Sequence, residues 1–190
     1  MRLVPPVCER CGSPSAWPVR RCSECAGRRL GFETARAGIL YDPHARVFVV
    51  KWKERGRRDL SSLAAELVAD VLPRPDADAV TFVPGERDRV LLRGHAPPKR
   101  LAWELGSLWG IPVHPLLVRA RHVSRQRGLS LADRRRNVAG AFVAVARPPK
   151  RVVLVDDVYT TGSTVRACAI ALRRAGVERV DVACLARAVR

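Results

Sequence analysis

Two adjacent aspartates and a run of small hydroxyl residues form the group in this sequence that is best suited to chemistry. Asp156 and Asp157 follow the apolar run Val152–Val155, and the next residues include Thr160, Thr161, Gly162, Ser163 and Thr164. Backbone N–H groups in such a turn and at a helix start bind anions, and the hydroxyls add donors for phosphate oxygens. Paired carboxylates accept hydrogen bonds from vicinal ribose hydroxyls and help to hold Mg²⁺. The combination favours a ribose phosphate site over an ordinary turn in which Asp and Thr only cap a helix.

Four cysteines near the N-terminus form a second group with a recognisable spacing. They make two C-x-x-C pairs, consisting of Cys8, Cys11, Cys22 and Cys25. Each pair supplies two thiolates from one tight turn, which is the donor set of a structural zinc site that leaves no position open for catalysis. The alternatives are two disulfides or free thiols, and an expected cytoplasmic location disfavours disulfides. The remaining cysteines, Cys168 and Cys184, lie in apolar contexts and are expected to be buried small hydrophobes.

Alternating strand and helix patterns surround these residues and predict an α/β fold with a mainly parallel sheet flanked by helices. Strands are expected at 39–41, 79–84, 113–118, 140–145, 152–155 and 180–185, and helices at 61–72, 99–109 and 164–175. The segment 47–52 fits either a strand or a helix. In the helix at 61–72, Leu63, Leu67 and Val71 are expected to lie on one face. Since ligands of parallel sheets bind beyond the carboxyl ends of the strands, Asp156 and Asp157 are well placed.

The composition points to a strongly basic protein outside the membrane. The formal net charge is +17, with only four lysines among the basic residues. Such a charge favours a nucleic-acid partner, although an arginine-rich composition also arises without one, and both interpretations stay open. No apolar run is long enough to span a bilayer, and no signal peptide precedes the first cysteine pair, so a cytoplasmic location is expected.

One segment carries this charge at unusual density. Residues Arg119–Asn137 contain seven arginines and a single acid, Asp133. The segment is interpreted as a hood over a reaction centre, a DNA-binding strip, or both, against the simpler alternative of a solvated surface. Around the cysteines lie further arginines, which motivate the hypothesis that this region contacts DNA or a partner: Arg10, Arg20, Arg21, Arg28 and Arg29.

The string VVLVDDVYTTGST resembles the motif of type I phosphoribosyltransferases that binds 5-phosphoribosyl-1-pyrophosphate (PRPP). The resemblance extends over most of the chain to the ComF/GntX-like family, which is associated with natural competence and uptake of single-stranded DNA. Its other elements are the four cysteines, Lys53 to Gly56 with the helix that follows, Val83-Pro84 leading to Arg93-Gly94, and a set in the later basic segment: Arg119, Arg121, Gln126, Leu129, Ser130, Arg134, Asn137, Val138, Gly140, Ala141 and Phe142.

The resemblance implies roles for individual residues. It implies that Asp156 and Asp157 contact the ribose, with Mg²⁺ bound there together with PRPP, and that Thr160–Thr164 hold the 5′-phosphate. Arg93 and His95 are implied at the pyrophosphate end, where the family usually reads R-G-F-N and this chain has Arg-Gly-His-Ala. Purine-salvage relatives carry an Asp at the position of Thr160, so salvage of a 6-oxopurine is disfavoured.

Two functions follow as expectations. The first is a Mg²⁺-dependent phosphoribosyltransferase of the ComF type with an unknown acceptor, for which no general base is assigned. The second is a non-catalytic PRPP sensor or adaptor that binds single-stranded DNA or the DNA-uptake machinery. Residues 1–34 are expected to form a four-cysteine zinc module, and residues 35–190 a phosphoribosyltransferase-like domain.

Overall fold

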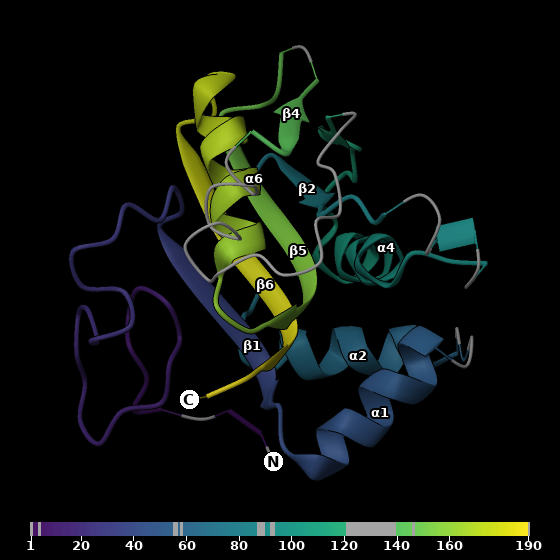
Figure 1. Ribbon diagram of the computed structural model, residues 1–190. Coiled ribbons are helices and arrows are strands. Elements are labelled where there is room, and N and C mark those ends of the chain that lie inside the picture. Colours follow the sequence, from purple (N-terminus) through teal and green to yellow (C-terminus); the bar gives the residue numbers. More distant parts are fainter. Residues whose placement is uncertain are drawn as a thin grey trace, which may run out of the picture.

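Parallel strands form the central sheet of the protein (Figure 1). The computed structural model describes residues 2–3, 5–54, 57, 59–86, 90–91, 94–120, 140–145 and 147–189. The strand order is β1 (Thr34–Leu40), β6 (Arg179–Arg187), β5 (Arg151–Tyr159) and β2 (Ala79–Phe82), and each adjacent pair is parallel. The expected α/β fold with a mainly parallel sheet is therefore confirmed.

Helices cover both faces of the sheet, because its strands are apolar on both sides (Figure 1). On one face lie α1 (Pro43–Glu54), α2 (Leu60–Ala69) and α4 (Pro97–Trp109). On the other face lie α6 (Ser163–Arg174) and the antiparallel pair β3 (Leu117–Arg119) and β4 (Phe142–Ala144). Along β5, Val152 and Leu154 pack with the core under α6, whereas Val153 and Val155 pack with the opposite core. This alternation within a continuous apolar run is what a doubly covered strand requires.

Two local expectations are settled by packing. The ambiguous segment 47–52 is part of helix α1. The helix expected at 61–72 is α2, whose buried face consists of Ser61, Ala64, Ala65 and Val68, whereas Leu63 is exposed. The reason is close approach: a Cβ on Gly38 of β1 would lie 2.6 Å from the carbonyl oxygen of Leu67. A helix this close to the sheet must present its small side chains.

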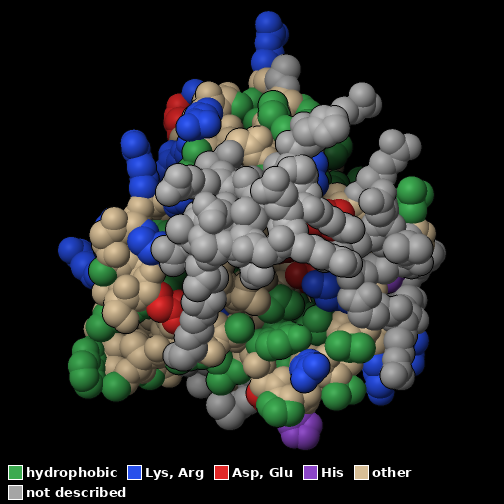
Figure 2. All heavy atoms as spheres, viewed as in Figure 1, with side chains coloured by type: hydrophobic (Ala, Val, Ile, Leu, Met, Phe, Trp, Pro, Cys, Tyr) green, Lys and Arg blue, Asp and Glu red, His purple; other side chains and the backbone are tan. Residues whose placement is uncertain are grey.

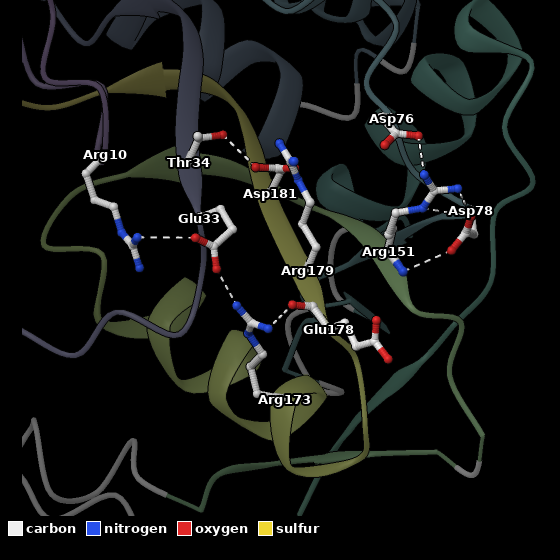
Figure 3. A network of polar contacts seen from close by, with 10 residues as sticks. All are labelled: Arg10, Glu33, Thr34, Asp76, Asp78, Arg151, Arg173, Glu178, Arg179 and Asp181. Carbon is white, nitrogen blue, oxygen red and sulfur yellow. Dashed lines mark hydrogen bonds and ion pairs between the residues drawn. The ribbon is translucent and has the colours of Figure 1, made fainter. Parts of the chain in front are cut away.

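Ion pairs hold the amino edge of the sheet together (Figure 3). Arg151, the first residue of β5, donates to Asp78 just before β2 at 2.7 Å, and the same guanidinium lowers the pKa of Asp78. Arg179, the first residue of β6, pairs with Asp181, which accepts a hydrogen bond from Thr34 of β1 at 2.7 Å. These contacts join neighbouring strands at the edge opposite the candidate ligand site.

The N-terminal segment packs against the α6 side of the sheet through the same core as β5 and β6. Its buried residues Cys8, Cys11, Cys25, Leu30 and Phe32 belong to that core. Glu33 pairs with Arg10 of this segment and with Arg173 of α6, so it bridges the two (Figure 3). Among the described helices, none combines the length and apolar character needed to cross a bilayer.

Candidate functional site

The acid pair lies where β5 reaches the carboxyl edge of the sheet. Asp156 is buried and stands opposite Cys184 in the β5–β6 register. The backbone N–H of Asp157 donates to Asp156 Oδ1 at 2.9 Å, and that of Val158 donates to Asp157 Oδ1 at 2.7 Å. Burial, helped by the neighbouring charge of Asp157, raises the pKa of Asp156 to about 8. A carboxyl that is protonated at neutral pH both donates and accepts hydrogen bonds, whereas an ionised one only accepts, and a ribose hydroxyl can pair with either.

Lys53 of α1 forms an ion pair with the second acid, Asp157. Its Nζ, in the last turn of α1, lies 2.6 Å from Asp157 Oδ2, and the two side chains are only 22% and 13% exposed. The two acids therefore have different surroundings, because a cation accompanies Asp157 while Asp156 faces the apolar core. Lys53 brings a positive charge to the edge of the sheet where a phosphorylated ligand is expected.

The hydroxyl turn between β5 and α6 has the geometry of an anion site. Gly162 is the N-cap of α6 with φ 69°, and as a glycine it has no side chain to cap the helix. The first N–H groups of α6 lack intrahelical acceptors, and that of Ser163 donates to Thr161 Oγ1 at a long 3.3 Å. Thr161 Oγ1 and Ser163 Oγ lie 2.8 Å apart, so two hydroxyls converge beside these N–H groups. Thr160 is exposed, and Thr164 lies in the first turn of the helix.

The expected pyrophosphate end is described only in part. Arg93 lies outside the described residues, as does the segment 121–137 that holds most of the predicted basic strip. His95 is buried, and its Nε2 donates to the backbone carbonyl of Trp52 at 2.9 Å. This contact supports the end of α1 immediately before Lys53.

The four N-terminal cysteines converge as their spacing predicts. The Sγ atoms of Cys8, Cys11, Cys22 and Cys25 all lie within 4.8 Å of one another. Individual Sγ–Sγ distances are 3.7 Å for Cys8–Cys25, 3.4 Å for Cys11–Cys22 and 3.9 Å for Cys22–Cys25. Tetrahedral zinc with Zn–S bonds of about 2.3 Å places its sulfurs about 3.8 Å apart. The donor set therefore fits a tetrahedral metal such as zinc.

The electrostatics of the cluster also suit a cation. Burial and the nearby Cys8 and Cys22 raise the pKa of Cys25 to about 11, and burial raises the pKa of Cys11 as well. Burial opposes ionisation of Cys8 too, but hydrogen bonds from the backbone of Cys11, Cys22 and Arg10 outweigh it and lower the pKa of Cys8 to about 7. A divalent cation at the centre is what would stabilise several thiolates packed this closely.

An arginine-lined groove runs along the junction between the cysteine segment and α6. Two cavities of about 650 and 930 Å³ share Arg28, Arg29, Arg166 and Arg174 and so form one groove. It begins at Ser163 of the hydroxyl turn, and no carboxylate of the described residues lines it. Figure 2 shows several Lys and Arg side chains at the upper left of the molecule. The arginines that line the groove are Arg10, Arg21, Arg28, Arg29, Arg166, Arg173 and Arg174.

Comparison with known proteins identifies the family. The model of the phosphoribosyl transferase domain matches residues 118–189. "Competence protein F" of Haemophilus influenzae is 32% identical to this chain over 96% of the chain and 85% of the relative. This chain belongs to the competence protein F (ComF) family. "DNA utilization protein YhgH" of Salmonella typhi is 31% identical over 95% of the chain and 84% of that protein.

A solved structure is also similar to this ComF family member. The glutamine PRPP amidotransferase from B. subtilis, complexed with ADP and GMP, has 30% sequence identity and a TM-score of 0.44. The alignment covers 68% of this chain and 26% of the amidotransferase, so the chain spans about a quarter of that enzyme's length.

Three residues at the site of this ComF chain had no role assigned from the sequence. Lys53 was named as part of the family resemblance, but without a role. Its ion pair with Asp157 joins distant parts of the chain, so no local sequence pattern predicts it. Tyr159 and Arg187 end the adjacent strands β5 and β6 and are buried together below the hydroxyl turn. An arginine closing the apolar run VACLA was the one available hint, since a buried charge needs partners.

Proposed function

We propose that this ComF family member binds PRPP, together with Mg²⁺, at the carboxyl edge of β5. Asp156 and Asp157 hold the ribose hydroxyls, and Thr160–Thr164 hold the 5′-phosphate. The observation that carries the proposal is the juxtaposition of an acid pair, of which Asp156 is buried, with a helix start at which N–H groups and hydroxyls converge. Lys53 joins the site as the cation beside Asp157.

The same arrangement supports phosphoribosyl transfer. A nucleophile would attack the anomeric carbon of PRPP, and pyrophosphate would leave with the bonding electrons. When bound, Mg²⁺ supplies positive charge to the pyrophosphate oxygens. The protein holds the ribose through Asp156 and Asp157 and adds Lys53 as a further cation near the departing group. The acceptor stays open, and Arg93 and His95 are proposed for the pyrophosphate end.

Calorimetric titration of PRPP with Mg²⁺ tests this site. We expect saturable binding by the zinc-loaded wild type and loss of at least about 100-fold in affinity in the Asp156→Asn, Asp157→Asn double variant, because neutral amides accept from ribose hydroxyls more weakly than carboxylates do and do not help to hold Mg²⁺. Asp70→Asn is the control, since Asp70 is an exposed acid at the end of α2. Equal affinity in the double variant and wild type would place PRPP elsewhere.

We further propose zinc as the metal of the four-cysteine cluster, and residues 1–34 as the module that it organises. The Sγ geometry supports the metal, and a cytoplasmic location, also proposed, would keep the thiols reduced. Metal analysis of protein purified without chelator should give one zinc per chain. A protein that lacks zinc but contains two disulfides would contradict this assignment.

A second function, binding of single-stranded DNA in the context of competence, is supported by the arginine groove. Among the described residues, neither a carboxylate nor an aromatic side chain lines it beside its arginines. Such a surface recognises phosphates without reading bases, so binding would be independent of sequence and sensitive to salt. Because the groove begins at Ser163, occupancy of the PRPP site would influence it, as a PRPP-sensing DNA-binding protein requires.

Salt-dependent binding of a fluorescent oligothymidylate tests the groove. Replacing Arg29 and Arg174 by Gln should reduce affinity about ten-fold at low salt and flatten the dependence of log K on log salt by about 0.7 per lost contact. The control removes the same charge from α1, on the opposite face, through Arg46→Gln and Lys51→Gln. Equal losses in both double variants would indicate attraction by net charge rather than a groove.

A further inference from the structure

Arg187 joins the four-cysteine cluster to the central sheet. It ends β6, is 1% exposed, and directs its guanidinium into the cysteine segment. One terminal nitrogen donates to the backbone carbonyl of Cys11 at 2.8 Å, and the other donates to Glu24 Oε2 at 2.7 Å. Cys11 is itself one of the four cysteines, and Glu24 directly precedes Cys25. A planar guanidinium that holds two acceptors in this way is fixed in orientation as well as position.

The same guanidinium fixes the last residue before the hydroxyl turn. Its Cζ lies 4.3 Å from the ring centroid of Tyr159, which ends β5. Phe32 holds the ring from another side, edge-on at 6.4 Å between centroids. Tyr159 is therefore confined between the sheet and the cysteine segment, and its side chain cannot move without disturbing Arg187 or Phe32.

Two contacts carry this arrangement into the turn itself. The Tyr159 hydroxyl lies directly under Gly162, where an added Cβ would be only 2.2 Å from it. The guanidinium of Arg28 donates to the carbonyl of Thr161 at 3.4 Å and to the carbonyl of Glu24 at 3.0 Å. The cysteine segment thus contacts two successive residues of the turn by separate routes, one through Arg187 and Tyr159 and one through Arg28.

We propose that Arg187 and Tyr159 are positioning residues that couple metal occupancy of the four-cysteine cluster to the shape of the phosphate turn. With the cluster closed around a metal, Cys11 and Glu24 hold Arg187, Arg187 holds Tyr159, and Tyr159 supports Gly162 so that the N–H groups after it stay aligned. With the cluster open, the turn is not held in shape before the phosphate binds. Ordering it then reduces the binding free energy, so the affinity for the phosphate falls. Loss of the metal, or oxidation of the thiols, then weakens ligand binding at a turn that none of the four cysteines belongs to.

The ligand of this inference rests on the proposed function, but its test separates the two halves of PRPP. Ribose 5-phosphate probes the turn, whereas inorganic pyrophosphate probes the end assigned to the segment between β2 and α4. Each is titrated into zinc-loaded wild type, chelator-treated wild type, Tyr159→Phe and Arg187→Lys. Tyr41→Phe is the control, as Tyr41 packs with the opposite core.

The expected result is selective. Affinity for ribose 5-phosphate falls on the order of ten-fold in the chelated protein and in both variants, while pyrophosphate affinity and the zinc content of Tyr159→Phe stay unchanged. Equal weakening of both ligands would show a general structural role and overturn the coupling, as would unchanged binding of ribose 5-phosphate.

Hydrogen exchange provides a readout that needs no ligand. Chelation and Tyr159→Phe should both speed amide exchange in residues 160–166 more than in β2. Turn amides that exchange at the same rate with and without metal would overturn the coupling. If the wild type binds neither half of PRPP, the proposed function has failed, and this exchange result alone decides the coupling.

Discussion

At the residue scale, the two adjacent aspartates have different surroundings. Asp156 faces the core beside Cys184, whereas Asp157 is paired with Lys53. Burial first, and the charge of Asp157 second, raise the pKa of Asp156 to about 8. A carboxyl kept protonated by the fold lowers the free energy of unfolding at neutral pH. Such a destabilising group is expected at a binding site rather than in an ordinary core.

This destabilisation predicts that a neutral side chain in place of Asp156 stabilises the protein. The unfolded pKa of Asp is about 3.9, so between that pH and about 8 only the folded state holds the proton, and stability falls as pH rises. Asp156→Asn keeps an acceptor for the Asp157 N–H without a charge to bury. The free energy of unfolding of Asp156→Asn, relative to that of the wild type, should therefore be higher at pH 7.5 than at pH 5. The expected increase between these two pH values is at least about 1 kcal/mol. Urea unfolding at both pH values measures this, and a pH-independent difference would contradict it.

Lys53 gives a second prediction at this scale. Replacing it by Met removes the cation beside Asp157 and should weaken PRPP binding on the order of ten-fold. Lys51→Met is the matched control, because Lys51 lies on the same helix and is exposed. Calorimetry on both variants compares them directly. Equal affinities of the two variants would exclude Lys53 from the site.

At the scale of the element, the turn from β5 to α6 depends on one glycine. Gly162 and Gly110 have similar left-handed backbones, with φ of 69° and 64°. An added Cβ would collide with the Tyr159 hydroxyl at Gly162 but meets nothing within 4 Å at Gly110. Both Ala substitutions carry backbone strain of about 1 kcal/mol, and only Gly162→Ala adds a clash.

Gly162→Ala should therefore destabilise the protein more than Gly110→Ala, by at least about 1 kcal/mol, and only Gly162→Ala should impair PRPP binding. Thermal unfolding and PRPP titration of the two variants measure both effects. Identical losses of stability with intact binding would mean that Tyr159 yields freely and that the turn is not rigidly supported.

The sequence predicts those elements that are specified by local residue patterns. The buried strand at 152–155, the helix that ends before Gly176 and the paired C-x-x-C turns are each specified within a few residues. Helix α1 was ambiguous from its local pattern, and tertiary packing against Gly38 decided which residues of α2 are buried. Lys53 and Arg187 were missed as parts of the site since their partners lie far away in the chain.

At the scale of the molecule, the cysteine segment and the sheet share one core. Cys8, Leu30 and Phe32 pack with Leu154 and Leu172, and Glu33 links Arg10 to Arg173. Metal binding to the cluster would therefore stabilise more than the segment itself. If the zinc site only closed a peripheral loop, metal binding would not change the stability of the sheet.

Metal removal tests this shared core. Zinc-loaded protein should unfold in one cooperative transition, and Cys22→Ser or chelation should lower the midpoint of that single transition by several degrees. Differential scanning calorimetry distinguishes the outcomes. A separate low-temperature transition for the cysteine segment, with the main transition unmoved, would show that the two parts unfold independently.

A crystal structure of the complex with PRPP and Mg²⁺ would show whether PRPP lies at the β5–α6 turn. We expect the 5′-phosphate against the backbone N–H groups of residues 161–164, and the ribose hydroxyls within hydrogen-bond distance of Asp156 and Asp157. PRPP bound in the arginine groove away from the acid pair, or a zinc-loaded protein that takes up no PRPP at saturating concentration, would contradict this expectation.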